Sequence, residues 1–259
     1  MRIDLNEKVA LVTGSAQRVG RYIALELAKQ GVHIQVHYHS ADADVVRSTL
    51  HDIKSEGVDA FAVQADISQP EGVNTVMEAV KENFGRLDIL VNSASVFPAD
   101  SLLDISVESW NLTMNVNLRA PFLFTQAAAP LMMENDPSGG CIINICDQGA
   151  FAPWPKRPDH GVSKAGLWML TQTTAVSLGP DIRANAIAPG PIMKPPKGMT
   201  DEQWVLLGKS LPVEHTGSPE DVAHAVTYLC QNSFITGILL PVNGGEHLQV
   251  PHGSSSDYT

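Results

Sequence analysis

The feature that most constrains this chain is a regular alternation of short apolar runs with amphipathic, helix-like runs along most of its length. It begins with an apolar run at 8–12, the loop TGSAQRVG at 13–20, and a helical pattern that Gly31 closes as a C-cap. This alternation predicts βαβ units and a parallel sheet covered by helices on both faces. The next predicted elements are strands at 32–38, 60–64 and 87–91, and helices at 41–55 and 70–84.

The alternation continues through the second half of the chain. A long helix is predicted at 107–133, where Pro121 can introduce a kink. The segment 189–212 carries five prolines and is predicted to be an irregular surface excursion. The remaining elements are predicted as strands at 141–145, 182–188 and 237–242, a helix from about Asp159, and a last helix that Ser218, Pro219 and Glu220 open.

Length and composition limit the fold and the partners. A chain of 259 residues without an obvious linker predicts one α/β domain over residues 1–250, followed by a flexible Ser-rich tail at 251–259. The net charge of −11 argues against nucleic acid and against an anionic membrane surface as partners. No run of 18 apolar residues occurs, and the N-terminus MRIDLNEK lacks a signal-peptide core, so we expect a cytoplasmic protein.

The cysteines agree with a reducing compartment. Cys141, Cys146 and Cys230 are too few, and odd in number, for a disulfide framework. We expect all three to fill the core. Cys146 lies beside a candidate site residue, but a thiol flanked by isoleucines is expected to be buried and inert.

The loop TGSAQRVG lies between a predicted strand and a predicted helix. In that context backbone N–H groups and the helix dipole can hold a pyrophosphate. The middle glycine of a dinucleotide fingerprint is missing, and Arg18 stands in its place. The loop thus exchanges a close backbone approach for a guanidinium that can bind phosphate.

The end of the second strand predicts which dinucleotide binds. An NAD enzyme places Asp or Glu there, against the ribose 2′-hydroxyl. Here the sequence is His37-Tyr38-His39-Ser40, with no acid to repel a 2′-phosphate. Since His39, Ser40 and Arg18 offer donors, the sequence predicts NADP(H).

His33, His37 and His39 share one face of the same predicted strand, which raises the possibility of a metal site. We reject this interpretation, because no cysteine or carboxylate joins them at ligand spacing and a strand inside a doubly wound sheet leaves little room. No metal site is predicted.

The stretch from Cys141 to Gly166 gathers titratable side chains. Asp147 ends a predicted strand, and His160 and Lys164 lie four residues apart on the next helix. Residues at i and i+4 share a helix face, so the imidazole and the ammonium should both point to the end of the strand that carries Asp147. This arrangement is typical of a site that handles protons.

Several motifs together resemble the short-chain dehydrogenase/reductase family over nearly the whole chain. They are the spacing TGxxxRxG, the segment VNSAS at 91–95, Asn117, and Lys164 four residues after a polar residue. The resemblance implies a Rossmann-type, seven-stranded, doubly wound parallel sheet. It also implies a homotetramer.

Within that family the sequence is most similar to the pteridine reductases. The shared features are an arginine in the middle of the glycine loop, HYH with Ser40 at 37–40, VQADIS at 63–68, VNSASVF at 91–97, and Asp147 thirteen residues before His160. This similarity implies NADPH as the cofactor and a pterin-like heteroaromatic ring as the small-molecule substrate. The lysine or arginine that these reductases commonly have directly after His39 is absent.

The resemblance also implies roles for single residues. Lys164 would hold the nicotinamide ribose hydroxyls and lower the pKa of the adjacent acid, Asn117 would anchor a relay water, and Asp66 would accept from the adenine amino group. The implied cofactor-binding residues are Gly14, Arg18, Val19, Gly20, His39, Ser40, Asp66, Ile67, Asn92, Ala94, Lys164, Pro189 and Gly190. For Asp66 the ordinary alternative is a helix cap before Pro70.

The implied substrate residues are Arg18, Ser95, Phe97 and Asp147, with Phe97 stacking on the ring. A protonated Asp147, its pKa raised by burial, would donate to a ring nitrogen. The implied catalytic residues are Asn117, Asp147, His160 and Lys164.

The main departure from the family is His160, which stands where the family has its catalytic tyrosine. We expect His160 and Asp147 to titrate as a coupled pair that shares one proton. Three functions remain open: an NADPH-dependent pterin reductase, a reductase of another carbonyl or imine, and a catalytically weakened NADP(H)-binding regulatory protein.

Overall fold

Seven parallel strands form one sheet in the computed structural model, in which residues 2–195 and 198–248 are described. Their spatial order is β3-β2-β1-β4-β5-β6-β7, so the chain reverses direction across the sheet between β1 and β4. This confirms the predicted doubly wound α/β fold. The strands are β1 (Val9–Val12), β2 (His33–Tyr38), β3 (Ala60–Gln64), β4 (Ile89–Asn92), β5 (Gly140–Ile145), β6 (Ile182–Pro189) and β7 (Leu239–Val242).

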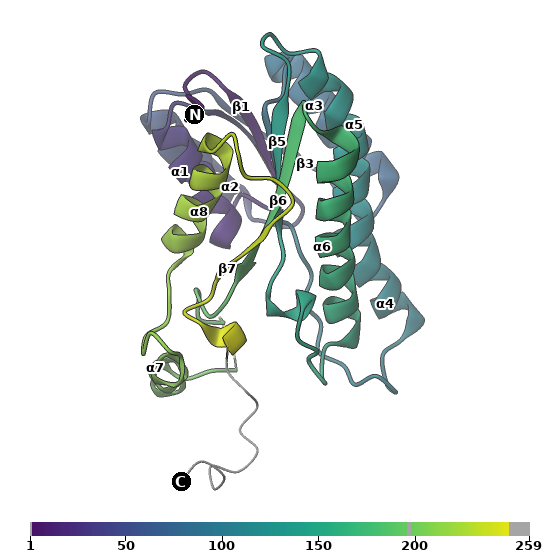
Figure 1. Cartoon of the computed structure of the whole chain (residues 1–259), viewed down its shortest axis with the longest axis vertical. Coiled ribbons are helices and arrows are strands. Elements are labelled where there is room, and N and C mark those ends of the chain that lie inside the picture. Colours follow the sequence, from purple (N-terminus) through teal and green to yellow (C-terminus); the bar gives the residue numbers. More distant parts are fainter. Residues whose placement is uncertain (1, 196–197, 249–259) are drawn as a thin grey trace, which may run out of the picture.

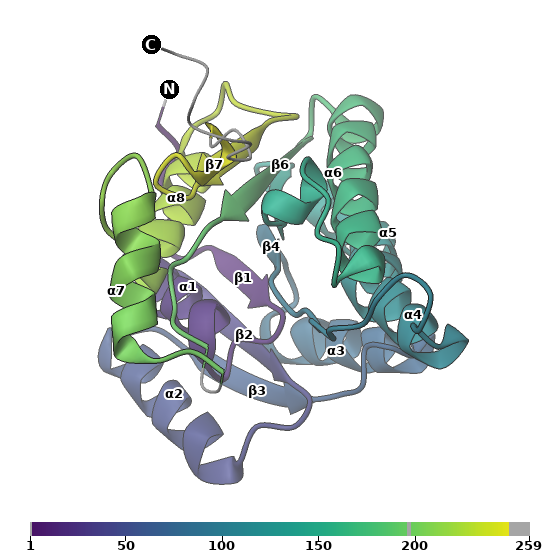
Figure 2. The ribbon, with the colours of Figure 1, turned by 90° about the horizontal axis from the view of Figure 1, so that it is seen from below.

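Helices cover both faces of the sheet, as Figures 1 and 2 show. One face carries α1 (Arg18–Lys29), α2 (Ala43–Ser55) and α8 (Pro219–Gln231); the other carries α3 (Pro70–Phe84), α4 (Val107–Met114), α5 (Ala120–Met133) and α6 (Pro158–Leu178). Each face has its own core, because successive side chains of a strand point to opposite faces. In β1, Ala10 and Val12 join the core under α1, whereas Val9 and Leu11 join the core under α3 and α5.

The predicted helix at 107–133 is interrupted. Residues Asn115–Arg119 form the π-helical turn η1 between α4 and α5, in which the Ala120 N–H bonds to the Asn115 carbonyl. Pro121 lies directly after this π-helical turn, at the start of α5. π-Turns inside helices often occur at functional sites, and this one carries Asn117.

The segment 189–212 is more regular than predicted, because it contains α7 (Asp201–Ser210). The Thr200 side chain accepts from the Gln203 N–H, and the Gln203 side chain accepts from the Thr200 N–H. This capping box was visible in the sequence as Thr-x-x-Gln, but the proline content obscured it.

All three cysteines are buried and free, as predicted. Burial raises the pKa of the Cys146 thiol to about 12, which makes this thiol inert at neutral pH.

None of the helices within the described residues combines the length and the apolarity needed to span a membrane. The tail predicted at 251–259 lies outside the described residues.

The carboxyl ends of β1, β4 and β5 lie side by side at one edge of the sheet, the edge that faces the viewer in Figure 2. The loops that follow these strands begin at Thr13, Ser93 and Cys146. In doubly wound sheets this edge, at the point where the strand order reverses, is where ligands bind.

Candidate active site

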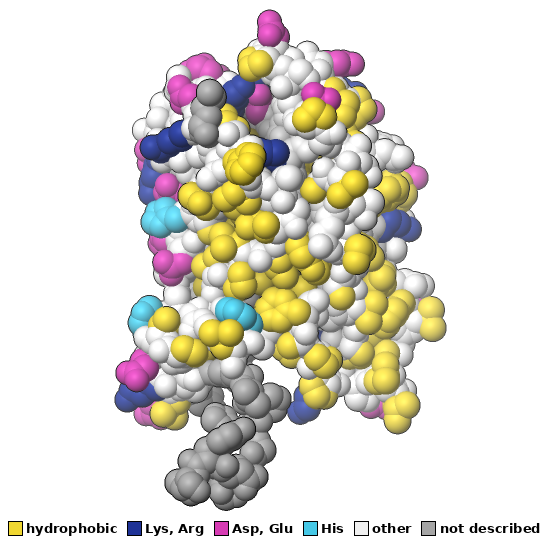
Figure 3. Space-filling model, in the orientation of Figure 1, with side chains coloured by type: hydrophobic (Ala, Val, Ile, Leu, Met, Phe, Trp, Pro, Cys, Tyr) yellow, Lys and Arg dark blue, Asp and Glu magenta, His cyan; other side chains and the backbone are white. Residues whose placement is uncertain are grey.

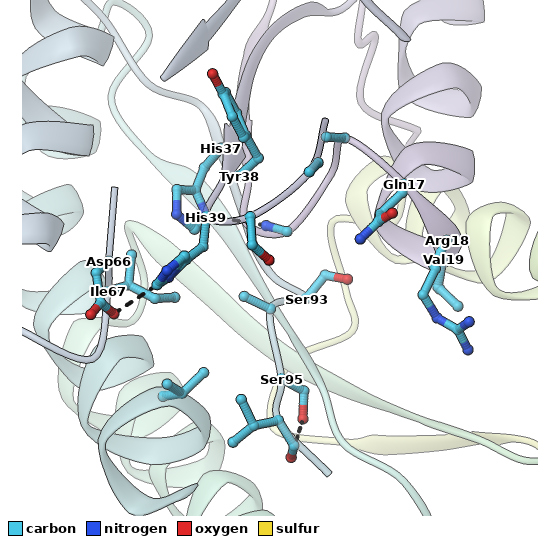
Figure 4. A pocket seen from close by; sticks show the side chains of 18 of the residues that line it. Gln17, Arg18, Val19, His37, Tyr38, His39, Asp66, Ile67, Ser93 and Ser95 are labelled. Carbon is cyan, nitrogen blue, oxygen red and sulfur yellow. Dashed lines mark hydrogen bonds and ion pairs between the residues drawn. The ribbon is translucent and has the colours of Figure 1, made fainter. Parts of the chain in front are cut away.

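A cavity of ≈ 520 Å³ opens at this edge, beside the point of reversal between β1 and β4 (Figure 4). Its size is in the range of small-molecule and cofactor sites. Among the predicted cofactor and substrate residues, its lining includes Gly14, Arg18, Val19, Gly20, His39, Ser40, Asp66, Ile67, Ala94 and Ser95.

Close packing leaves no room for a side chain at two positions of the glycine loop, Gly14 and Gly20. A Cβ added to Gly20 would lie 2.5 Å from the Gly14 carbonyl oxygen, and one added to Gly14 would lie 3.0 Å from the Ala94 Cα. The Thr13 hydroxyl accepts from the N–H groups of Ser93 and Ala94 at 2.9 and 3.0 Å. The loop is thus fixed against the start of α1 and the segment after β4, in an arrangement that fits a dinucleotide phosphate.

Arg18 adopts a backbone φ of +53°. This left-handed region favours glycine, so the residue that replaces the middle glycine keeps the conformation of a glycine. Its side chain is exposed, and Figure 4 places it across the pocket from His39 and Asp66. The guanidinium and the His39 imidazole would therefore contact different parts of a bound dinucleotide.

His39 and Asp66 form the other end of the cavity. The His39 Nδ1 lies 3.6 Å from the Asp66 Oδ1, which also accepts from the Ser68 N–H at 2.9 Å. A hydrogen bond from Ser68 is the main reason that the pKa of Asp66 lies below its ordinary value. Asp66 does not cap α3, whose N-cap is Gln69.

Three further residues predicted to bind cofactor do not line this cavity but lie at the ends of strands. Asn92 is buried at the end of β4, where its amide nitrogen donates to the Asn144 Oδ1 at 2.8 Å. Pro189 ends β6, and the Gly190 N–H bonds to the Val242 carbonyl at 3.0 Å. All three lie at the same edge of the sheet as the glycine loop.

Asp147, His160 and Lys164 come together directly after β5. The His160 Nε2 bonds to the Asp147 Oδ2, and the Asp147 Oδ1 accepts from the Gly149 N–H at 2.7 Å. The Lys164 Nζ donates to the Ile145 carbonyl at 2.8 Å. The predicted shared helix face is confirmed, because both buried side chains of α6 contact the 145–147 segment.

The structure reverses the expected charge state of Asp147. Burial alone would raise the pKa of Asp147, but the His160 hydrogen bond and the Lys164 charge outweigh burial, and the net pKa is lowered. The expectation of a protonated Asp147 was therefore wrong. It considered burial without the His160 hydrogen bond and the Lys164 charge, which favour the carboxylate form.

Asn117 connects this cluster to the cavity wall. Its Oδ1 accepts from the Val96 N–H at 2.9 Å, and its Nδ2 donates to the Val96 carbonyl at 3.0 Å. The His160 Nδ1 lies 3.3 Å from both the Asn117 Nδ2 and the Val96 carbonyl oxygen. That nitrogen can accept from Asn117 when it is bare and donate to Val96 when it is protonated, so the surroundings accommodate neutral and charged imidazole alike.

An aromatic wall stands beside His160. The Phe97 ring is 49% exposed, and its centroid lies 4.4 Å from that of His160 and 5.5 Å from that of Trp154. The Arg157 guanidinium lies 3.5 Å from the Phe97 centroid and donates to the carbonyls of Phe97 and Pro98. Sequence reasoning missed Trp154 and Arg157; their one signal is their position just before the helix that carries His160.

Glu246 is a second carboxyl near Asp147, and sequence reasoning missed it as well. In the orientation that lets both groups bond, the Gln148 amide nitrogen donates to both Glu246 oxygens, at 3.0 and 2.8 Å. Burial, together with the Asp147 charge, raises the pKa of Glu246. A Cβ on Gly190 would lie 2.9 Å from the Glu246 Oε2, so a glycine at 190 leaves room for this carboxyl.

The three histidines of the second strand have separate partners. His33 contacts Glu7 and Asp59, whereas His39 pairs with Asp66. His37 contacts the glycine loop. Within residues 2–195 and 198–248, no group of three or more His, Cys, Asp or Glu side chains is arranged to hold a metal ion.

Comparison with known proteins places this geometry in context. A family model described as enoyl-(acyl carrier protein) reductase matches residues 14–247. Glucose 1-dehydrogenase 2 of Bacillus subtilis is 35% identical over 93% of this chain and 95% of its own length.

Solved structures show the same similarity. FolM alternative dihydrofolate reductase 1 from Brucella canis, complexed with NADP, superimposes with a TM-score of 0.89 at 28% identity, over 97% of this chain and 99% of its own. A blue fluorescent protein from a metagenomic library, in complex with NADPH, has a TM-score of 0.85 at 33% identity, over 94% and 99% of the two chains.

Proposed function

Because the chain belongs to the short-chain dehydrogenase/reductase family, we propose that this NADP-dependent oxidoreductase reduces a pterin-like, dihydropteridine substrate. The observation that carries the proposal is the hydrogen-bonded pair of Asp147 and His160 beside the half-exposed ring of Phe97. That pair can deliver a proton, and the aromatic ring offers a flat surface to a heteroaromatic substrate.

The cofactor would lie along the cavity at the strand ends. We propose that the glycine loop and Arg18 hold the phosphates, that His39 and Ser40 contact the 2′-phosphate, and that Asp66 and Ile67 flank the adenine. Asn92, Ala94, Pro189, Gly190 and Lys164 would surround the nicotinamide riboside. When bound, NADPH supplies the hydride.

The proton would come from the Asp147–His160 pair. By the sequence resemblance, His160 would take the place of the family's tyrosine, and both of its nitrogens face protein groups. Asp147 is the more exposed partner, so its carboxylate would meet the substrate nitrogen. An imidazolium at His160 would pass its Nε2 proton to Asp147, and Asp147 would pass a proton to the substrate nitrogen. The second proton would stay on Nδ1 and donate to the Val96 carbonyl.

Lys164 and Asn117 support that transfer. The Lys164 ammonium lowers the pKa of Asp147, which keeps the carboxylate ionised at rest. Asn117 holds the Val96 backbone, and with it the carbonyl that faces the His160 Nδ1. We propose that these two residues, with Asp147 and His160, form the catalytic set.

The substrate would lie against Phe97, with Ser95 and Arg18 as polar contacts. Arg157 covers one face of the Phe97 ring, so a flat substrate would stack on the other face or replace the guanidinium. The Glu246 carboxyl offers an acceptor for the adjacent N–H groups of an aminopyrimidine ring.

The test is NADPH oxidation with a panel of dihydropterins, dihydrofolate, simple ketones and glucose-type sugars. The proposal expects turnover with the dihydropterins and at least tenfold lower kcat/KM with the ketones. The glucose dehydrogenase relative favours a carbonyl or sugar substrate as the second candidate. Preference for ketone or sugar would establish that candidate, and tight NADPH binding without any turnover would indicate a regulatory, nucleotide-binding protein.

We also propose a cytoplasmic homotetramer. The three free cysteines suit a reducing compartment. Two apolar grooves run along α5 and α6, and Phe122 lines both. Figure 3 shows hydrophobic side chains over the part of the surface where β7 and α6 lie in Figure 1, and such a surface suits contact between subunits.

A further inference from the structure

His37 is buried, with 1% of its surface exposed, in the wall of the cofactor cavity. Its Nδ1 lies 3.2 Å from the Gly14 nitrogen, which donates to it. Its Nε2 lies 3.1 Å from the Ala65 carbonyl oxygen. A carbonyl can only accept, so Nε2 carries the hydrogen and Nδ1 carries the lone pair. The two contacts together fix one neutral tautomer.

The two partners of His37 belong to different segments at the cavity: Gly14 lines it, and Ala65 directly precedes two residues that line it. Gly14 opens the glycine loop, at the phosphate end. Ala65 precedes Asp66 and Ile67, which line the adenine end (Figure 4). The backbone reinforces the link, because the Ser15 N–H bonds to the His37 carbonyl and the Ala65 N–H bonds to the Tyr38 carbonyl. One imidazole therefore spans two segments that a dinucleotide must contact simultaneously.

We infer that His37 is a positioning residue for the nucleotide: its neutral imidazole holds the glycine loop at a fixed separation from the Asp66–Ile67 segment. The inference rests on NADP(H) binding at this cavity and adds a residue that would not touch the cofactor itself. The segment after β4 packs against Gly14, where an added Cβ would lie 3.0 Å from the Ala94 Cα, and the imidazole holds Gly14 through its N–H.

The electrostatic surroundings keep this imidazole neutral. Burial lowers the pKa of His37 to about 4; the Ala65 carbonyl and Asp66 oppose that shift, and His39 adds to it. A proton on Nδ1 would point at the Gly14 N–H, and two donors cannot bond to each other. Protonation would therefore release the loop.

Two substitutions separate the two contacts. In His37→Asn the side-chain oxygen takes the place of Nδ1 and can still accept from Gly14, but the contact to Ala65 is lost. In His37→Gln the amide nitrogen takes the place of Nε2 and can still donate to Ala65, but the acceptor for Gly14 is lost. Both replace the ring with a smaller amide, so they serve as matched controls for packing.

We expect His37→Gln to weaken NADP⁺ binding by roughly tenfold, the scale of one lost hydrogen bond with its unpaired partner. The loss in His37→Asn should be less than threefold, because the Ala65 N–H still bonds to the Tyr38 carbonyl and keeps that segment on β2. Titration calorimetry measures the Kd, and melting temperatures verify that both variants fold. Equal Kd values for wild type and His37→Gln, or equal losses in both variants, would show that the ring only fills space. If wild-type protein fails to bind NADP⁺, the premise of a cofactor site fails instead.

Two measurements on wild-type protein need no substitution. Nitrogen NMR reports the tautomer, and a His37 that carries its hydrogen on Nδ1 would overturn the inference. The wild-type affinity for NADP⁺ should also fall as pH is lowered toward 4, with circular dichroism confirming the fold. Asparagine cannot be protonated in this range, so His37→Asn should not lose affinity in acid in the same way. A loss of affinity in His37→Asn that matches the loss in wild type would overturn the inference.

Discussion

Arg18 occupies a left-handed backbone position that glycine adopts at almost no cost. The sequence shows that an arginine replaces the middle glycine of the loop. It did not predict that the backbone of Arg18 would adopt the conformation typical of glycine. A non-glycine residue there costs about 1 kcal/mol, and such strain is commonly retained at functional sites. At this position the side chain would therefore favour ligand binding, whereas the backbone conformation lowers the stability of the fold.

Two substitutions at Arg18 separate these contributions. Arg18→Gly and Arg18→Ala both remove the guanidinium, so both should weaken NADPH and pterin binding by roughly tenfold. Arg18→Gly should also have a free energy of unfolding about 1 kcal/mol higher than that of Arg18→Ala, because only glycine relieves the backbone strain. Fluorescence titration and urea unfolding measure the two effects. Identical stabilities would mean that the φ of +53° carries no strain.

The Asp147–His160 pair shows what single residues could and could not reveal in advance. Spacing predicted that the two side chains meet, and they do. The charge state of Asp147 was predicted wrongly, because the balance of burial against His160 and Lys164 depends on their arrangement in space. The corrected state, a carboxylate paired with an imidazole, changes the expected pH behaviour.

Activity should fall as pH rises, because the pair must hold its extra proton on His160 for delivery through Asp147. Asp147→Asn should reduce kcat by roughly 10²-fold, the usual scale for a positioned acid, and His160→Tyr should preserve turnover and move the alkaline limb upward. pH–rate profiles with a dihydropterin measure both. Unchanged rates in His160→Ala and Asp147→Ala would remove the pair from the mechanism.

His37 should also make the fold sensitive to acid. Its pKa falls from 6.5 to about 4 on folding, so between these values the unfolded chain binds more protons. The free energy of unfolding should be highest above pH 6.5 and should decrease as pH falls from 6.5 through 4. The decrease of the His37 pKa from 6.5 to about 4 corresponds to a loss of about 3 kcal/mol. Urea unfolding at pH 7 and pH 4 should show this loss in wild type and a smaller loss in His37→Asn.

At the scale of elements, most boundaries followed from local pattern. The strand at 60–64 and the helix at 70–84 were predicted to the residue. The π-turn at Asn115–Arg119 was not, because its cause lies elsewhere in the chain: Asn117 is held by the Val96 backbone and faces His160. A helical pattern in sequence carries no information about such distant partners.

The helix α7 gives a test at this scale. Thr200→Ala removes one half of the capping box, which should destabilise α7 by about 1 kcal/mol. Amide exchange in α7 should then accelerate roughly fivefold, without acceleration in α4. Ser106→Ala removes the corresponding side-chain cap of α4, so it should accelerate amide exchange in α4 without acceleration in α7. Equal acceleration of both helices in either variant would show that they open together.

At the scale of the whole molecule, the sequence predicted the layered sheet but not how the site is completed. Trp154, Arg157 and Glu246 enter the site through contacts between segments far apart in the chain. The tetramer stays a prediction, and the exposed apolar surface of α5 and α6, where 45% of Phe122 is accessible beside two grooves, is the contact that we would test.

Phe122→Asp should break the assembly, because it places a charge in an apolar contact. Val205, on α7, is likewise exposed at 55% but lies outside both grooves, so Val205→Asp is the matched control. Light scattering should find four chains in wild type and in the control, and fewer in Phe122→Asp. A wild-type monomer would contradict the tetramer directly.

The cavity at the strand ends has a consequence for the order in which the protein matures on the ribosome. Every residue that lines it lies between positions 14 and 116, whereas His160, Lys164 and Glu246 are synthesised later. A nascent chain thus exposes the residues that line the cavity before Lys164, Pro189 and Gly190, the other proposed cofactor residues, have been synthesised. Under the proposed binding mode, the nucleotide site is therefore complete only after the second half of the chain has been synthesised.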